Sequence, residues 1–265
     1  MSITFATFAA YGAPQLPDGT IEQISLHTWS IRKSHGPEAT AVLLTDDILS
    51  DECVLKQFDI VRRRPVAKST LLLDRARHYR EFLDVHDWES HIALLDFDIL
   101  VMKDLHPIFS GAADLYVTIR AWTKNMPING GVIFLEQGRA DACRRFYDDV
   151  LSSYEGMTPE HKAWFGDQLA LMLAATTGAK NAGPDQIETR SGAVVGFVAR
   201  NEYNFTPYDV DSGQEIPAAP PAQEIESFKD RPILHFKGPR KHLMHIVALA
   251  AGLEEKSSQT QALAP

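Results

Sequence analysis

Apolar and polar positions follow two different periods along this chain, and the periods predict strands and helices in turn. Short runs rich in β-branched and aromatic residues predict strands at residues 3–8, 40–45, 91–95, 115–119, 132–135 and 233–236. Apolar residues three or four apart predict helices at residues 20–32, 68–83, 139–154, 167–175 and 239–253, with Asp18 as the candidate N-cap of the first. Strands that alternate with helices favour an α/β fold, with a mostly parallel central sheet flanked by helices.

No internal repeat and no clear domain boundary interrupts this pattern, so we expect residues 1–253 to form a single domain. Residues 254–265 are small and polar, which predicts a disordered tail. The proline-rich segment 216–223 predicts a loop, and the three arginines at residues 62–64 predict a solvated basic turn.

The most informative polar residues are Asp96 and Asp98, which lie one residue apart in the otherwise apolar run HIALLDFDILV of residues 91–101. Side chains two residues apart on a strand point the same way, and two neighbouring carboxylates repel each other and are costly to bury. A divalent cation removes that cost, and oxygen ligands suit Mg²⁺ or Mn²⁺. The alternative interpretation is a pair of turn or helix-cap carboxylates. A second Asp-x-Asp, at residues 209–211, lies in a polar stretch and predicts a solvated loop.

A histidine and a glycine loop end the last predicted strand, in the segment HFKGPRK of residues 235–241. His235 is a candidate metal ligand, although a lone histidine is more often structural. Gly238 allows the backbone to approach a phosphate, and Lys241 adds a positive charge at a helix start, where anions are favoured. A metal site beside such a loop favours chemistry with a diphosphate leaving group, whose developing charge the cation would neutralise.

Two further segments are candidates for substrate contact. Asn129-Gly130-Gly131-Val132 puts two glycines before an apolar strand, which indicates either close approach to a ligand or an ordinary glycine turn. Gly166-Asp167-Gln168 puts a polar pair at a helix start, where Asp167 is either an N-cap or a site residue.

Composition narrows the function classes. The 265 residues carry a formal net charge of −9, which argues against nucleic acid or an anionic membrane as the main partner. Two cysteines are too few for a disulfide framework, so a reducing compartment is favoured. The first residues lack the basic region of a signal peptide, and no run of 18 apolar residues predicts a membrane span. We therefore expect a cytoplasmic protein.

Taken in order, these motifs resemble those of glycosyltransferase family 8 and its glycogenin-like relatives, which have the GT-A fold. The run LDFDILV at residues 95–101 is similar to the family's Asp-x-Asp between apolar residues. Residues 235–241 resemble its H-F-x-G-x-x-K, although His242-Leu243 follows where the family usually has Pro-Trp. Asn129-Gly130-Gly131-Val132 resembles its N-[ST]-G-V, with Gly130 departing from that pattern.

The resemblance implies roles for individual residues. Asp96, Asp98 and His235 would bind Mn²⁺ or Mg²⁺, and Gly238 and Lys241 would hold the diphosphate. Asn129 and Gly131 would contact the donor sugar, and Asp167 and Gln168 would lie near the anomeric carbon as the candidate catalytic pair. Three matches at single residues would complete the donor site. Thr7 and Tyr11 would contact the base and the ribose of the nucleotide, and Lys68 would be a basic residue near the donor.

The sequence therefore predicts a metal-dependent, retaining glycosyltransferase that moves a sugar from a nucleoside diphosphate, UDP being the expected nucleotide, to an acceptor hydroxyl. Three alternatives stay open. A sugar-phosphate nucleotidyltransferase usually has a glycine-rich basic loop after its first strand, where this chain has AAYGAP. A dinucleotide-dependent oxidoreductase would need a G-x-G-x-x-G after a strand, and no predicted strand has one. A non-catalytic nucleotide-sugar-binding protein would keep the same motifs. The acceptor, the sugar and the oligomeric state are not indicated.

Overall fold

A nine-stranded mixed sheet forms the centre of the computed structural model, which describes residues 1–120, 127–163, 165–209 and 213–253. The tail expected at residues 254–265 lies outside the described residues. The strand order is β3-β2-β1-β4-β7-β6-β10-β9-β8. The strands are β1 (Ile3–Phe8), β2 (Thr40–Asp46), β3 (Ile60–Arg64), β4 (His91–Asp96), β6 (Leu115–Ile119), β7 (Ile128–Leu135), β8 (Lys180–Gly183), β9 (Gln186–Glu188) and β10 (Val194–Ala199).

Strand direction decides which side chains meet. The strands β3, β2, β1 and β4 are parallel neighbours, β7 runs against β4 and β6, and β10 is again parallel to β6. The carboxyl ends of β1, β2, β4, β6 and β10 therefore lie at one edge of the sheet, the edge at which open α/β sheets bind ligands. The expected mostly parallel α/β sheet is confirmed, with β7 and the β8–β9 hairpin as its antiparallel parts.

A second, two-stranded sheet brings the late part of the chain back to the middle. Strand β5 (Ile99–Val101) pairs with β11 (Ile233–His235), so that His235 lies opposite Ile99. The backbone N–H of Phe236 also donates to the carbonyl of Asp98 at 2.8 Å. This pairing joins the two predicted motifs, although Asp98 and His235 lie 137 positions apart in the sequence.

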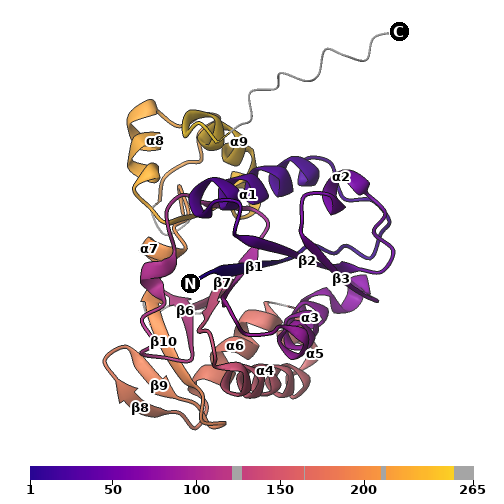
Figure 1. The fold of residues 1–265 in the computed structure, drawn as a ribbon, viewed down its shortest axis with the longest axis vertical. Helices are drawn as coiled ribbons and strands as arrows, with labels where there is room; N and C mark the ends of the chain where they lie inside the picture. The colour runs from indigo at the N-terminus through magenta and orange to yellow at the C-terminus, as the bar shows by residue number, and fades with distance from the viewer. Residues whose placement is uncertain (121–126, 164, 210–212, 254–265) are drawn as a thin grey trace.

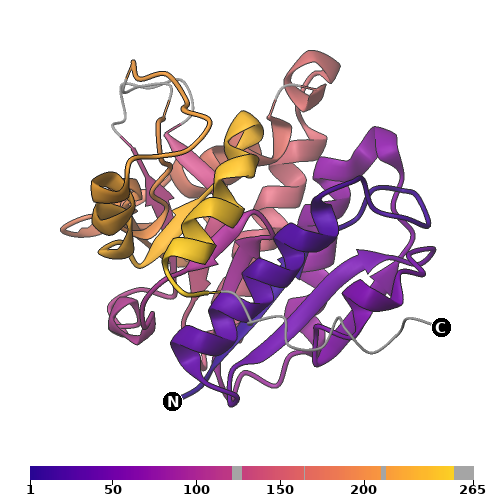
Figure 2. The ribbon, with the colours of Figure 1, turned by 90° about the horizontal axis from the view of Figure 1, so that it is seen from above.

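Helices cover both faces of the large sheet (Figures 1 and 2). Helices α3, α4 and α6 pack on the face that carries Ala6 and Phe8, whereas α1 packs with β5 and α9 on the opposite face. The helices are α1 (Thr20–His35), α2 (Glu52–Leu55), α3 (Leu71–Val85), α4 (Ala140–Glu155), α5 (Pro159–Ala163), α6 (Gly166–Thr176), α7 (Arg200–Tyr203), α8 (Ala222–Lys229) and α9 (Lys241–Ala250). None of these helices is both long and apolar enough to cross a membrane.

Several local predictions are wrong, each for a physical reason. Arg62–Arg64 belong to the edge strand β3 and not to a turn. Arg63 donates to the carbonyl of Leu49, and Arg64 forms an ion pair with Glu81. Asp18 is not the cap of α1, which begins after Gly19 in a left-handed conformation. The proline-rich stretch expected as a loop to residue 223 gives way to α8 at Ala222. Residues 129–131 lie inside β7, where a turn was one of the two interpretations.

Candidate metal and donor site

The turn between β4 and β5 carries the two aspartates of the Asp-x-Asp motif. Strand β4 ends at Asp96, Phe97 and Asp98 form the turn, and β5 begins at Ile99. Because β11 pairs with β5, the His235 side chain reaches both carboxylates. One ligand atom from each of Asp96, Asp98 and His235 lies within 4.8 Å of the others. The structure thus brings together all three predicted metal ligands.

The second Asp-x-Asp behaves differently. Asp209 forms an ion pair with the buried Arg200, and Val210 and Asp211 lie outside the described residues. Asp209 follows no strand and pairs with Arg200, whereas Asp96 and Asp98 follow β4 and both face His235. Strand context, and not the motif alone, therefore distinguishes the two copies.

Two of the candidate ligands, Asp98 and His235, are buried, and their surroundings shift the pKa of each. His235 Nε2 lies 3.0 Å from Asp98 Oδ1 and 3.6 Å from Asp96 Oδ2. Burial lowers the pKa of His235, with Lys237 adding repulsion, so the ring is neutral. Burial opposes ionisation of Asp98, but the positive charges of a protonated His235 and of Lys241 outweigh it and lower the pKa of the carboxyl. A neutral imidazole and an ionised carboxylate are the forms that ligate metals.

Hydrogen bonds determine which His235 nitrogen faces the aspartates. The backbone N–H of Gly131 donates to Asn129 Oδ1 at 3.1 Å, which orients that amide. Asn204 Nδ2 donates to the same Oδ1 at 2.9 Å and to the Thr118 hydroxyl at 2.8 Å. Asn204 Oδ1 is then the acceptor for His235 Nδ1–H at 2.9 Å. In the neutral ring, Nε2 is left with its lone pair directed at Asp98, an arrangement that a cation between them would satisfy.

Gly131 leaves room for this arrangement. A Cβ at this position would lie 2.4 Å from His235 Cε1 and 2.5 Å from Asp96 Oδ2, far inside van der Waals contact. The close approach expected at the glycine pair is, at Gly131, an approach of the backbone to the side chains of two candidate metal ligands. The side chain of Asn129 meanwhile donates from Nδ2 to Gln168 Oε1 at 3.2 Å, which joins the predicted sugar contact to the predicted catalytic pair.

Arg75 on α3 is a site residue that sequence analysis missed. Its Nη1 donates to Asp96 Oδ1 at 2.9 Å, and its Nη2 forms an ion pair with Asp167. Asp96 Oδ2 is thereby left facing His235. Asp167 is not an N-cap, since no side chain caps α6, and its Oδ1 is buried without a hydrogen-bond partner in the described structure. The guanidinium thus connects the candidate metal ligands to the candidate catalytic pair.

Positive charge gathers on the solvent side of the aspartates. Lys241 Nζ lies 3.6 Å from Asp98 Oδ2 and 4.7 Å from the centre of the Phe97 ring. Gly238 has φ +56°, which glycine adopts without strain, and begins the 3-10 turn that leads into α9. Burial and the charge of Arg200 lower the pKa of Lys237 to about 7. Gly238 and Lys241 therefore lie at the same edge of the sheet as the metal ligands.

The remaining predicted donor contacts surround the end of β1. The Thr7 hydroxyl is buried and bonds to His27 Nε2 at 2.8 Å, so Thr7 reaches the site only through that ring. Tyr11 lies with its ring centre 6.4 Å from that of Phe97, and its backbone N–H donates to Asp46 Oδ2 at 3.1 Å. Lys68 is exposed, and its backbone lies next to Gly12.

Asp46 is a second residue that sequence analysis left without a role. It ends β2 fully buried, and its Oδ1 has no hydrogen-bond partner among the residues described. A buried carboxylate oxygen without a donor is rare in folded proteins and indicates a missing partner. Its position at the carboxyl end of a predicted strand was the signal that could have identified it.

The sheet order and the Asp-x-Asp turn at its ligand-binding edge define the class of fold as that of the GT-A-like glycosyltransferases. No family model matches the sequence, and no curated protein sequence matches it. Several solved structures of glycosyltransferases share its fold. Galactosyltransferase LgtC, solved with donor and acceptor sugar analogs, is 16% identical, with 95% of each chain covered and a TM-score of 0.54.

Two further neighbours agree. A glycosyltransferase involved in glycosylation of the PBCV-1 major capsid is 14% identical, covering 93% of this chain and 100% of that one, with a TM-score of 0.54. The glycosyltransferase GlyE of Streptococcus pneumoniae TIGR4 is 15% identical, covering 94% of this chain and 59% of that one, with a TM-score of 0.57. At these identities the likeness establishes the fold alone, and membership of family 8 stays a prediction.

Proposed function

We propose that this protein is a metal-dependent, retaining glycosyltransferase that uses a nucleoside-diphosphate sugar, with UDP as the expected nucleotide. The observation that carries the proposal is the convergence of Asp96, Asp98 and the Nε2 lone pair of His235 on one point. Two carboxylates and an imidazole form a ligand set that suits Mn²⁺ or Mg²⁺. A bound cation would neutralise charge that develops on the departing diphosphate.

The chain's own residues supply the rest of the leaving-group site. Lys241 already lies beside Asp98, and its ammonium can also approach a diphosphate oxygen at the start of α9. The backbone at Gly238 lies open on one side, because a Cβ there would contact nothing within 4 Å. A positively charged side chain and accessible backbone at a helix start are the usual means of phosphate binding.

Asp167 and Gln168 are the groups proposed to act at the anomeric carbon. Arg75 holds Asp167, and Asn129 holds Gln168, so both side chains are fixed before substrate arrives. Sugar transfer passes through an oxocarbenium-like state, which a nearby carboxylate or amide oxygen stabilises. The nucleotide would lie beside Tyr11 and Phe97, with the backbone of Tyr11 held by its bond to Asp46 Oδ2.

A thermal-shift panel of nucleotide sugars, with and without Mn²⁺, tests the proposal. We expect a shift that requires both the metal and one donor, followed by donor hydrolysis or transfer with that donor. Asp98→Asn is expected to abolish the metal-dependent shift and the turnover while the protein stays folded. Asp141→Asn, an exposed aspartate on α4, is the matched control and should behave as the unmodified protein.

Unchanged turnover in Asp98→Asn would remove the metal role. Metal-dependent donor binding without hydrolysis or transfer to any acceptor would instead identify a non-catalytic nucleotide-sugar-binding protein. Formation of a nucleotide sugar from a nucleoside triphosphate and a sugar phosphate would identify a nucleotidyltransferase.

A further inference from the structure

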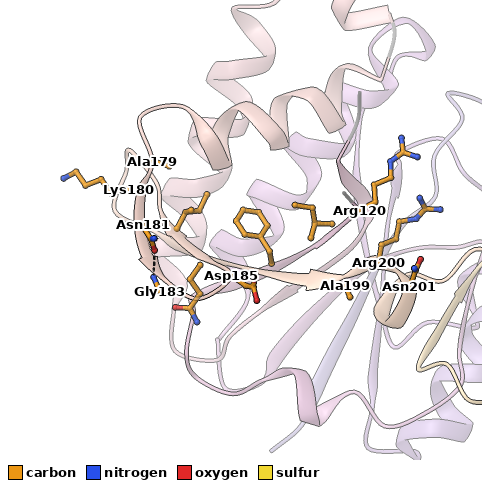
Figure 3. A pocket seen from close by; sticks show the side chains of 13 residues that line it. Arg120, Ala179, Lys180, Asn181, Gly183, Asp185, Ala199, Arg200 and Asn201 are labelled. Carbon is orange, nitrogen blue, oxygen red and sulfur yellow. Dashed lines mark hydrogen bonds between the residues drawn. The ribbon is translucent and has the colours of Figure 1, made fainter. Parts of the chain in front are cut away.

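A cleft of about 730 Å³ lies between the end of β6 and the β8–β9 hairpin (Figure 3). Its inner end is formed by Arg120, Arg200 and Asn201, and its outer end by the hairpin residues Lys180 and Asn181. We refer to it as the basic cleft. No motif in the sequence pointed to it, because its lining comes from segments that are distant along the chain.

The basic cleft opens at the same edge of the sheet as the metal ligands. Strands β6 and β10 are parallel neighbours, with Ile119 opposite Ala199, so Arg120 and Arg200 follow two adjacent strand ends. Figure 3 shows their side chains extending in the same direction. Thr118, just before Ile119, accepts a hydrogen bond from Asn204, which in turn holds His235. A group bound between the two arginines would therefore lie at the same edge of the sheet as the proposed donor.

Charge in the basic cleft is opposite to that of the whole protein. Among the described residues that line it, Arg120, Lys180 and Arg200 are positive and Asp185 is negative, with Asp209 paired to Arg200, whereas the chain has a formal net charge of −9. Arg200 is buried and is held by its ion pair with Asp209, so its guanidinium is fixed in place. A fixed arginine next to a second one is the arrangement that recognises phosphate or carboxylate groups.

The middle of the basic cleft suits a sugar ring. Ile187 and the aromatic ring of Phe197 line it, and the Gln186 side chain lies beside them. Apolar side chains with a few amide groups form the usual lining of small-molecule sites, where the apolar surface packs on the ring and the amides bond hydroxyls. Asn181 is less available, because its Oδ1 already accepts from the Gly183 N–H at 2.9 Å.

We propose that the basic cleft binds the acceptor, and that Arg120 and Arg200 select an acceptor sugar that carries a negatively charged group. This inference rests on the proposed glycosyltransferase function. In the transfer, the acceptor hydroxyl oxygen forms a bond to the anomeric carbon. The bond from that carbon to the diphosphate oxygen breaks, its electron pair stays with the diphosphate, and the hydroxyl proton passes to the departing phosphate oxygen.

Titrations with three probes test the inference. Glucose, glucose 6-phosphate and glucuronate are titrated separately, by calorimetry, into the protein saturated with UDP and Mn²⁺. We expect at least one of the two anionic probes to bind more tightly than glucose. The affinity of that probe should fall as the NaCl concentration is raised. Tighter binding of glucose 6-phosphate identifies a phosphate as the recognised group, and tighter binding of glucuronate identifies a carboxylate.

Variants assign the effect to the cleft. Arg120→Gln, at a half-buried position, should weaken the anionic probe about tenfold, the size expected for one charge-assisted hydrogen bond, and leave glucose unchanged. Lys180→Gln, at an exposed position, should give a smaller loss in the same direction. Lys56→Gln, whose lysine pairs with Glu52 on α2, is the control and should change nothing.

Two results would overturn the inference. One is equal affinity for glucose and both anionic probes. The other is an equal loss of UDP and anionic-probe affinity in Arg120→Gln, which would assign the arginines to the donor. UDP and Mn²⁺ binding is measured first in the unmodified protein, so failure of the proposed function appears there, separately from failure of the acceptor inference.

Discussion

His235 Nδ1 donates a hydrogen bond to Asn204 Oδ1 over 2.9 Å, and this contact determines the tautomer of the candidate metal ligand. Asn204 is fully buried, and its amide is oriented in turn by Asn129, whose own amide is oriented by a backbone N–H. A rigid backbone group thus controls which His235 nitrogen faces the aspartates. Such outer hydrogen bonds fix the orientation and the basicity of metal-binding histidines.

Replacing Asn204 should weaken metal binding without touching a ligand. In Asn204→Ala the His235 ring loses its acceptor and can rotate or change tautomer, so Mn²⁺ affinity in the presence of UDP should fall about 10- to 100-fold. Asn204→Asp keeps an acceptor for Nδ1–H and should retain more affinity than the alanine variant. Calorimetry measures both, with circular dichroism to confirm folding. Asn201→Ala, on the short helix that precedes Asn204, is the control, and equal affinity in Asn201→Ala and Asn204→Ala would contradict the prediction.

Local sequence was sufficient for the elements whose pattern is strong. The strand that ends at Asp96, the amphipathic helix after residue 68 and the glycine pair at residues 130–131 were all placed within a few residues. These segments combine clear periodicity with a run of buried apolar residues. The edge strands β3 and β8, and β9 beside β8, were missed, because an exposed strand with polar side chains lacks the alternation that identifies a half-buried one. The apolar strands β5 and β10 were missed as well.

The supporting residues of the site could not be predicted in the same way. Arg75 lies in an ordinary amphipathic helix, and nothing local distinguishes it from Arg77, two residues later and on the exposed side. Asn204 follows a four-residue helix that has no periodicity to detect. Both act through contacts with residues 21 or more positions away, which only the fold creates.

Arg75 should be needed for stability as well as for transfer. Arg75→Met leaves the carboxylates of Asp96 and Asp167 buried without their shared cation, which should lower the free energy of unfolding by about 3 kcal/mol. Loss of Asp167 positioning should lower the transfer rate about 100-fold. Urea unfolding and initial rates provide the measurements. Arg77→Met breaks the contacts to the buried Asp74 and the exposed Glu155, but the other oxygen of Asp74 keeps its bonds to Thr70 and Ala67, so this variant should lose less stability than Arg75→Met and none of the transfer rate. Similar losses in both variants would show that Arg75 is not special.

Gly131 should tolerate no side chain at all. In Gly131→Ala the added methyl overlaps His235 and Asp96, so one of these ligands must move. We expect metal-dependent donor binding to be lost, with about 1–3 kcal/mol of destabilisation from overpacking. Gly156→Ala is the matched control, because its Cβ would lie 3.5 Å from the nearest atom, with φ at −72°. If Gly131→Ala binds the metal as tightly as the unmodified protein does, the neighbouring side chains can move away from the added methyl without weakening the site, and the prediction is wrong.

Protein stability should fall between about pH 6.5 and pH 4 because of buried neutral histidines. Burial lowers the pKa of His27 from 6.5 to about 4, while the ring stays hydrogen-bonded to Thr7 and to the Ile99 carbonyl. Burial lowers the pKa of His78 to about 4 as well. Above pH 6.5 these rings are neutral in both states, so they add no pH dependence. Below pH 6.5 these histidines bind protons in the unfolded chain but stay neutral in the folded protein, so the free energy of unfolding falls.

The size of the effect follows from the pKa of His27 in the two states. A fully expressed shift from 6.5 to about 4 corresponds to about 3 kcal/mol lost on going from neutral pH to pH 4. Urea unfolding across this range, without metal, measures the total loss. Nuclear magnetic resonance of the His27 ring protons then separates its contribution from that of other groups, since the ring should remain neutral at pH 5 in the folded protein. If the His27 ring titrates near pH 6.5 in the folded protein, burial does not destabilise its charged form and the prediction is wrong.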